Sequence, residues 1–148
     1  MQQSFAVHFA CHGEPNSNPS ESKVLLADWE TDPFSVTEMA SLKLDNVRFV
    51  YLSACHAASN FNFGLLDEAI HMAGACQLAG FPTVIGTLWQ VSDKASASLA
   101  ESLYRTLLTD GGIIDFRRAA RGLHFAIRKE VLGGVSPMVW APYIHIGV

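Results

Sequence analysis

The sequence predicts an α/β protein, a three-layer α/β/α sandwich built around a mainly parallel sheet. Residues 4–10 (SFAVHFA) and 47–53 (VRFVYLS) are almost wholly apolar, as expected for strands covered on both faces. Segments with helical periodicity alternate with these strands, which is the pattern of consecutive β-α-β units. Hydrophobic residues make up 49% of the chain and charged residues 16%, so a globular core is expected rather than disorder.

The individual elements follow from local patterns of apolar, small and turn-forming residues. Ser35 is placed to cap a short helix, and Ser92 or Asp93 to cap a longer one. Loops are expected at residues 13–22, which are rich in Gly, Pro, Asn and Ser, and at residues 58–66. The last helix has an apolar stripe formed by Phe116, Ala119, Ala120, Leu123, Ile127 and Val131. The predicted strands cover residues 4–10, 24–27, 47–53, 83–89 and 143–146, and the predicted helices cover residues 37–42, 67–79, 93–108 and 116–131.

Length, charge and cysteine content narrow the functional classes. A chain of 148 residues fits one domain, and its formal net charge of −4 argues against a general affinity for nucleic acid or anionic membranes. The longest apolar stretch, residues 72–89, is broken by Gln77 and Pro82, so no membrane span is expected. The N-terminus has no signal-peptide pattern, and three cysteines suit a reducing compartment, so we expect a cytoplasmic protein. Because the chain opens directly with an inner-type strand, we expect it to be part of a larger protein.

Reactive residues follow both of the predicted inner strands. Cys11, His12 and Gly13 follow the first strand, and Cys55 follows the second. Active groups of parallel α/β sheets gather beyond the carboxyl ends of the strands, so neighbouring strands would bring His12 and Cys55 together. A thiol nucleophile needs a nearby base of this kind. The backbone amides of Gly13 and Cys55 are candidates for an oxyanion hole, since Gly13 has no Cβ to keep a substrate carbonyl away.

Five sequence blocks occur in a recognisable order. They are HFACHG at 8–13, VLLAD at 24–28, YLSAC at 51–55, AGACQLAGFPTVIGTLWQVSD at 73–93 and VWAPYIHIG at 139–147. Together they resemble the CHAT domain, a caspase-like cysteine peptidase family that often stands behind TPR or NLR-type regions. The resemblance covers essentially the whole chain. It implies a caspase-like fold, a catalytic dyad of His12 and Cys55, and an oxyanion hole formed by the amides of Gly13 and Cys55.

The resemblance also implies features outside the dyad. CHAT domains usually carry an upstream half with a further strand, so residues 1–148 are expected to be the C-terminal catalytic part of the protein. A TPR or NLR-type region, in the same chain or a partner chain, is the expected regulatory partner. The family often has an acidic or amide residue directly after the cysteine, where this chain has His56.

Two carboxylates and one tryptophan are candidates for the substrate pocket. Acidic residues crowd the region after His12, and some caspase-like relatives cleave after basic residues using an acidic pocket. By charge complementarity, Asp28 or Asp93 is a candidate for that role, and Trp89 for a pocket wall. The simpler structural roles are a turn residue for Asp28, a helix cap for Asp93 and a core side chain for Trp89.

Other polar and sulfur-containing residues have ordinary structural explanations. Cys76 is expected to pack in the core, as is Cys11, whose side chain points away from that of His12. His8 and His12 fall on the same side of their strand, opposite Cys11, which spoils a metal-ligand set, so no metal or cofactor is expected. His8, His71, His124 and His145 are assigned to structure or surface. Half of the Lys and Arg residues lie in the last helix, whose outer face is expected to be solvated, with partner docking as the alternative.

The residues and the resemblance together predict a regulated cysteine endopeptidase that cleaves a protein or peptide substrate in signalling or defence. The main alternative is a catalytically silent caspase-like signalling module. A metal-binding or redox protein is a third class, for which the spacing of His and Cys residues gives no signal.

Overall fold

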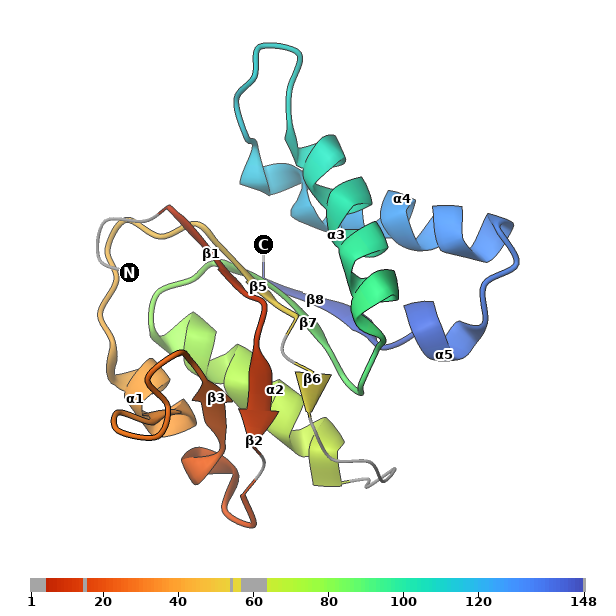
Figure 1. Cartoon of the computed structure of the whole chain (residues 1–148). Coiled ribbons are helices and arrows are strands. Elements are labelled where there is room, and N and C mark those ends of the chain that lie inside the picture. The colour runs from red at the N-terminus through yellow and green to blue at the C-terminus, as the bar shows by residue number, and fades with distance from the viewer. Residues whose placement is uncertain (1–4, 15, 54, 57–63, 148) are drawn as a thin grey trace.

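A computed structural model describes residues 5–14, 16–53, 55, 56 and 64–147 of the chain (Figure 1). At its centre is a four-stranded sheet in the order β1-β5-β7-β8. The first three strands run parallel, and β8 is antiparallel to β7. The predicted α/β class with a mainly parallel sheet is therefore confirmed. These strands are β1 (Ala6–Phe9), β5 (Phe49–Leu52), β7 (Thr83–Thr87) and β8 (Tyr143–Gly147).

A second, smaller sheet continues the first at the carboxyl ends of β1 and β5. Its order is β4-β3-β2-β6, in which β2 and β6 are parallel and the other pairs antiparallel. The register of β1 with β5 carries over into it: Phe9 pairs with Leu52, and three residues further along each strand His12 pairs with Cys55. The strands are β2 (His12–Glu14), β3 (Lys23–Leu25), β4 (Phe34–Ser35) and β6 (Cys55–His56).

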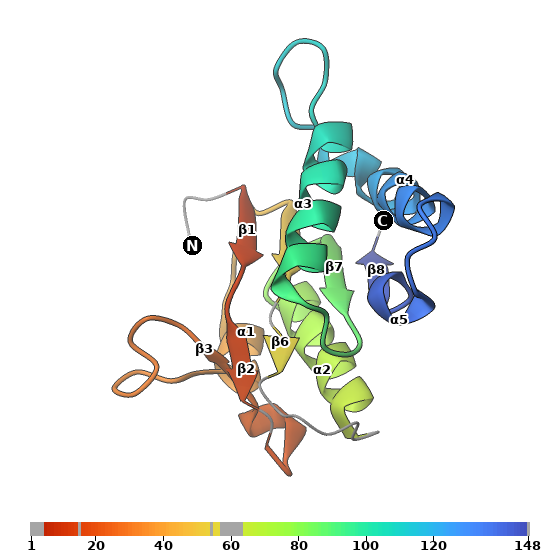
Figure 2. The same ribbon diagram turned by 45° about the vertical axis from the view of Figure 1, so that its right-hand side comes forward.

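Helices cover both faces of the central sheet, and β5 is therefore buried on both sides. Val50 and Leu52 pack with α1 and α2, whereas Phe49 and Tyr51 pack with α3 and α4. Figure 2 shows α3 in front of the sheet and α2 behind it. Burying a side chain such as Phe49 or Val50 contributes about 1.5–3 kcal/mol, so this strand is a large part of the core. The helices are α1 (Val36–Ser41), α2 (Gly64–Leu78), α3 (Asp93–Leu107) and α4 (Ala119–Leu132).

Local signals in the sequence placed the helix starts well. Ser35 caps α1 in a reciprocal capping box with Glu38, and Ser92 rather than Asp93 caps α3 through its hydroxyl. Two short helices were not predicted, η1 (Pro19–Glu21) and α5 (Pro137–Trp140), and the first turn of the last predicted helix is a 3-10 helix, η2 (Phe116–Arg118). Of the helices described, not one combines the length and the apolar character needed to cross a bilayer.

Two predictions about irregular and helical segments were wrong in detail. The loop expected from residue 13 begins later, because Gly13 and Glu14 still pair within β2, and most of the loop expected at residues 58–66 lies outside the described residues. On α4, Ala120 and Val131 of the predicted apolar stripe are exposed. The buried face instead includes Gly122, whose missing side chain leaves room for Leu103 of α3. The close contact of α4 with α3 at Gly122 therefore takes the place of contacts expected from Ala120 and Val131.

Gly80, between α2 and β7, is expected to tolerate no side chain. Its φ is +113°, and a Cβ there would come within 2.5 Å of the Leu44 carbonyl oxygen. We expect Gly80→Ala to lower the free energy of unfolding by about 1–3 kcal/mol, measured by urea denaturation. Gly74→Ala, in α2 with nothing within 4 Å of the new Cβ, is the matched control and is expected to stabilise by about 0.5–1 kcal/mol. Equal effects of the two substitutions would contradict this account.

Candidate active site

The two residues predicted as a catalytic dyad are partners in the strand ladder. His12 pairs with Cys55 in the parallel β2–β6 ladder, and Gly13 pairs with His56. Neighbouring strands of a sheet lie about 4.8 Å apart, so the backbones of His12 and Cys55 are side by side. The side chains of Cys55 and His56 are outside the described part of the structure. The pairing therefore brings the two residues together through their backbones, and the role of each side chain remains a prediction.

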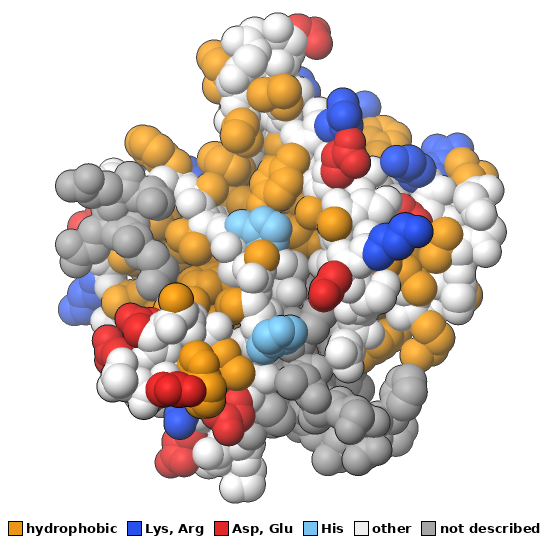
Figure 3. Space-filling model, viewed as in Figure 1, with side chains coloured by type: hydrophobic (Ala, Val, Ile, Leu, Met, Phe, Trp, Pro, Cys, Tyr) orange, Lys and Arg blue, Asp and Glu red, His pale blue; other side chains and the backbone are white. Residues whose placement is uncertain are grey.

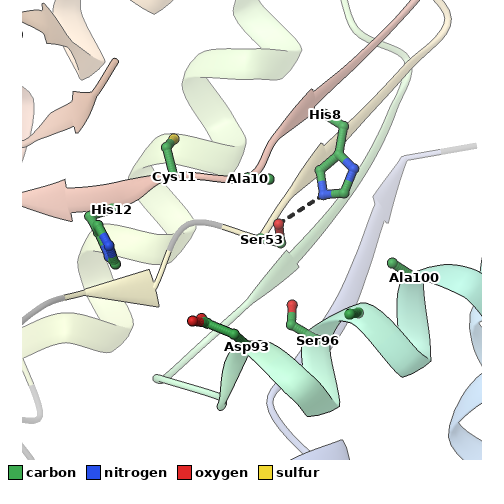
Figure 4. A pocket seen from close by; sticks show the side chains of 9 residues that line it. His8, Ala10, Cys11, His12, Ser53, Asp93, Ser96 and Ala100 are labelled. Atoms are coloured by element: carbon green, nitrogen blue, oxygen red, sulfur yellow. Dashed lines mark hydrogen bonds between the residues drawn. The ribbon is translucent and has the colours of Figure 1, made fainter. Parts of the chain in front are cut away.

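A cavity of about 320 Å³ opens beside His12. It lies between the ends of the strands and the first turns of α3, so strand-end residues form one wall and helix residues the other (Figure 4). The Asp93 side chain extends from the first residue of α3 toward the side of the cavity where His12 stands (Figure 4). The lining residues are His8, Ala10, Cys11, His12, Ser53, Asp93, Ser96, Ala97 and Ala100.

The cavity is lined by both polar and apolar residues. Among its described lining residues, Asp93 is the one carboxylate, and neither Lys nor Arg is present. Figure 3 shows this face of the molecule, with histidine side chains near its middle and hydrophobic side chains above them. The Asp93 carboxylate gives the cavity a group that can attract a positive charge.

His8, assigned from the sequence to structure or surface, is part of this cavity. Its Nε2 lies 2.8 Å from Ser53 Oγ, and its ring stacks on Tyr51 with centroids 4.6 Å apart. Packing that withdraws the ring from water lowers the pKa of His8. Side chains alternate along a strand, which puts His8 on the same side of the chain as His12, and this alternation could have placed His8 at the cavity. Ser53 had no comparable signal, because its contact joins residues 45 apart in the sequence.

The other two cysteines differ from a reactive thiol in their surroundings. The Cys11 side chain points away from His12 in Figure 4 and packs against the core formed with α1 and α2, as predicted. Burial raises the pKa of Cys11, and that of Cys76 to about 12, so both resist ionisation. Within the described residues, no three His, Cys, Asp or Glu side chains are grouped closely enough to hold a metal ion.

The remaining pocket candidates, Asp28 and Trp89, do not line this cavity in the described part of the chain. Asp28 is exposed in a turn, where its backbone carbonyl accepts hydrogen bonds from the amides of Thr31 and Asp32. The partly exposed Trp89 donates its indole N–H to the Met138 carbonyl oxygen at 2.9 Å. Asp28 fits its structural alternative as a turn residue, whereas Trp89 is not among the buried core residues, and a role in substrate binding stays a prediction for each.

The fold and the paired strand ends define a class of protein. A mainly parallel sheet is followed at the carboxyl ends of β1 and β5 by a short ladder in which the backbones of His12 and Cys55 pair. The CHAT domain family model matches residues 1–148, and the chain belongs to this family of caspase-like cysteine peptidases. No curated protein matches the sequence.

Two histidines whose pKa is lowered by packing make a prediction about stability and pH. Burial lowers the pKa of His8 and of His145 below 6.5, so the unfolded chain binds protons at a higher pH than the folded chain does. Their contribution to stability is complete above about pH 6.5 and is lost as the pH falls toward the lowered values. We expect the urea midpoint to be lower at pH 5.5 than at pH 7.5, and this difference to shrink in the double variant His8→Gln, His145→Gln. An undiminished difference would contradict the assignment.

Proposed function

We propose that this chain is a cysteine endopeptidase in which Cys55 is the nucleophile and His12 its proton-transfer partner. The observation that carries the proposal is the pairing of His12 with Cys55 at the carboxyl end of the sheet, beside a cavity of about 320 Å³. Membership of a caspase-like peptidase family supports the same chemistry. In this proposal the helices on both faces of the sheet form the caspase-like three-layer sandwich.

The proposed reaction has two halves. The Cys55 thiol gives its proton to His12, and the sulfur attacks the carbonyl carbon of the scissile peptide bond. The backbone amides of Gly13 and Cys55 donate hydrogen bonds to the resulting oxyanion, an arrangement that contributes about 3–4 kcal/mol per donor. As the C–N bond breaks, the leaving amine takes the proton from His12, and a thioester remains on Cys55. Water, deprotonated by His12, then attacks the thioester, which releases the acid and restores the thiol.

The setting of the reaction follows from the family rather than from the geometry. We propose a protein or peptide substrate, control by a TPR or NLR-type region, and a signalling or defence role in the cytoplasm. A silent signalling module is the competing function, and it needs neither a nucleophile nor a base. The decisive question is therefore whether Cys55 reacts with a substrate-like electrophile.

Covalent labelling with an acyloxymethyl-ketone peptide tests the dyad. We expect the parent protein to be labelled at Cys55, Cys55→Ala to be unlabelled and His12→Ala to react at least about 100-fold more slowly. Cys76→Ala and the exposed His124→Ala are matched controls that should keep the parent rate. Mass spectrometry identifies the labelled residue. A parent protein that turns over a peptide as fast as Cys55→Ala would favour the silent module.

The second expectation concerns the residue before the cleaved bond. Asp93 is the carboxylate of the cavity, so we propose that it favours a substrate with Lys or Arg at that position. We expect Asp93→Asn to reduce the preference for Arg over Leu, measured as a ratio of kcat/KM values, by about fivefold. Asp28→Asn is the matched comparison. A loss of preference in Asp28→Asn alone would move the acidic pocket to the turn after β3.

A further inference from the structure

His8 and Ser53 form a hydrogen-bonded connection between the ends of β1 and β5. The Ser53 hydroxyl donates to the Phe9 carbonyl oxygen at 3.2 Å, and the Ser53 amide donates to the same oxygen at 3.0 Å. A serine hydroxyl has one proton, and it is directed to a carbonyl that can only accept. With that proton on the Phe9 carbonyl, the tautomer of His8 that carries its proton on Nε2 donates to Ser53 Oγ, 2.8 Å away. Ser53 is held from two sides, by His8 and by Phe9.

The His8 ring is itself held in place by aromatic packing. It stacks on Tyr51, at an interplanar angle of 24°, and lies 5.8 Å from the ring of Tyr104. Tyr51 is fully buried in β5, and Tyr104 belongs to α3, so the two rings are anchored in the core and in the covering helix. These ring contacts favour the orientation in which Nε2 lies beside Ser53, which reduces the entropy lost on forming the hydrogen bond.

The His8–Ser53 hydrogen bond lies between the end of the β1–β5 ladder and the start of the β2–β6 ladder. Phe9 is the last residue of β1, and Ser53 follows the last residue of β5. The His12–Cys55 pair comes three and two residues later, respectively. With so few residues between them, a shift at Ser53 moves the paired residues relative to each other. A displacement of about 1 Å in a catalytic group is enough to cost about 100-fold in rate.

We propose that His8 is a positioning residue, whose hydrogen bond to Ser53 holds Cys55 in register with His12 for the reaction. This inference rests on the proposed peptidase function and deepens it. His8 acts through Ser53, so it is expected to change the rate of the chemical step and to leave the affinity for substrate largely unchanged. Both the neutral ring with its proton on Nε2 and the protonated ring can donate to Ser53. His8 is therefore expected not to add a limb of its own to the pH–rate profile.

The experiment measures kinact and KI for the acyloxymethyl-ketone peptide, with variants that separate the hydrogen bond from the packing. His8→Phe keeps a ring against Tyr51 and removes the donor, Ser53→Ala removes the acceptor, and His8→Gln restores a side-chain N–H. We expect His8→Phe and Ser53→Ala each to lower kinact about 10- to 100-fold, with KI changed by less than about twofold. The double variant should lose no more than Ser53→Ala alone, because that substitution already removes the bond to His8 together with the hydroxyl's bond to Phe9. His8→Gln should recover part of the rate.

The possible outcomes separate the two proposals. Parent-like kinact in His8→Phe, in a protein that labels at Cys55, overturns the positioning role and leaves the peptidase intact. Losses that multiply in the double variant, or that appear in KI, also overturn it, since they assign His8 and Ser53 to independent or substrate-binding roles. A parent protein that does not label at Cys55 contradicts the peptidase, and the positioning role falls with it. Urea midpoints of all variants identify any loss of rate that follows from unfolding.

Discussion

The structure depends on one constraint, the common register of two parallel strand ladders. The ladder of β1 with β5 and that of β2 with β6 use the same pairing, so the backbone carries the alignment of Phe9 with Leu52 forward to His12 and Cys55. Strand pairing is specified wherever the strands are buried, because a shift of one residue would turn every side chain to the wrong face. β5 is buried on both faces, which makes its register especially costly to change. The alignment of the candidate dyad is thus a consequence of core packing.

The two halves of the core make different contributions to the site. Tyr51 belongs to the half formed with α3 and α4, where it supports the His8 ring beside the cavity. Val50 and Leu52 belong to the half formed with α1 and α2, which encloses Cys76 and contacts Cys11. Burial in that half keeps these two thiols protonated, since it raises the pKa of each. Cys76 is fully buried in that half, whereas Cys11 packs against it and also borders the cavity with His8 and His12.

Sequence patterns predicted the class of fold and the approximate position of each long element. Continuous apolar runs identified β1 and β5, and the capping residues Ser35 and Ser92 located the starts of α1 and α3. The strand-end position of His12 and Cys55 also followed from the sequence, and the structure pairs their backbones. The short strands β4 and β6 gave no signal, because a strand of two residues is defined by its partner and not by its own composition. The apolar stripe of the last helix was overestimated, since the close approach of Gly122 to Leu103 depends on the shape of α3.

The sequence by itself determined which residues are candidates for chemistry, because residue type and strand periodicity are local properties. It placed His8 and His12 on one side of the chain and Cys11 on the other, and it marked Asp28, Trp89 and Asp93 as candidates around them. Only the tertiary structure decided that Asp93 shares a cavity with His12, while Asp28 lies in a turn and Trp89 donates to Met138. Only the tertiary structure brought His8 to Ser53, across 45 residues of sequence. Such contacts depend on how helices and strands pack, and no local pattern of side chains carries that information.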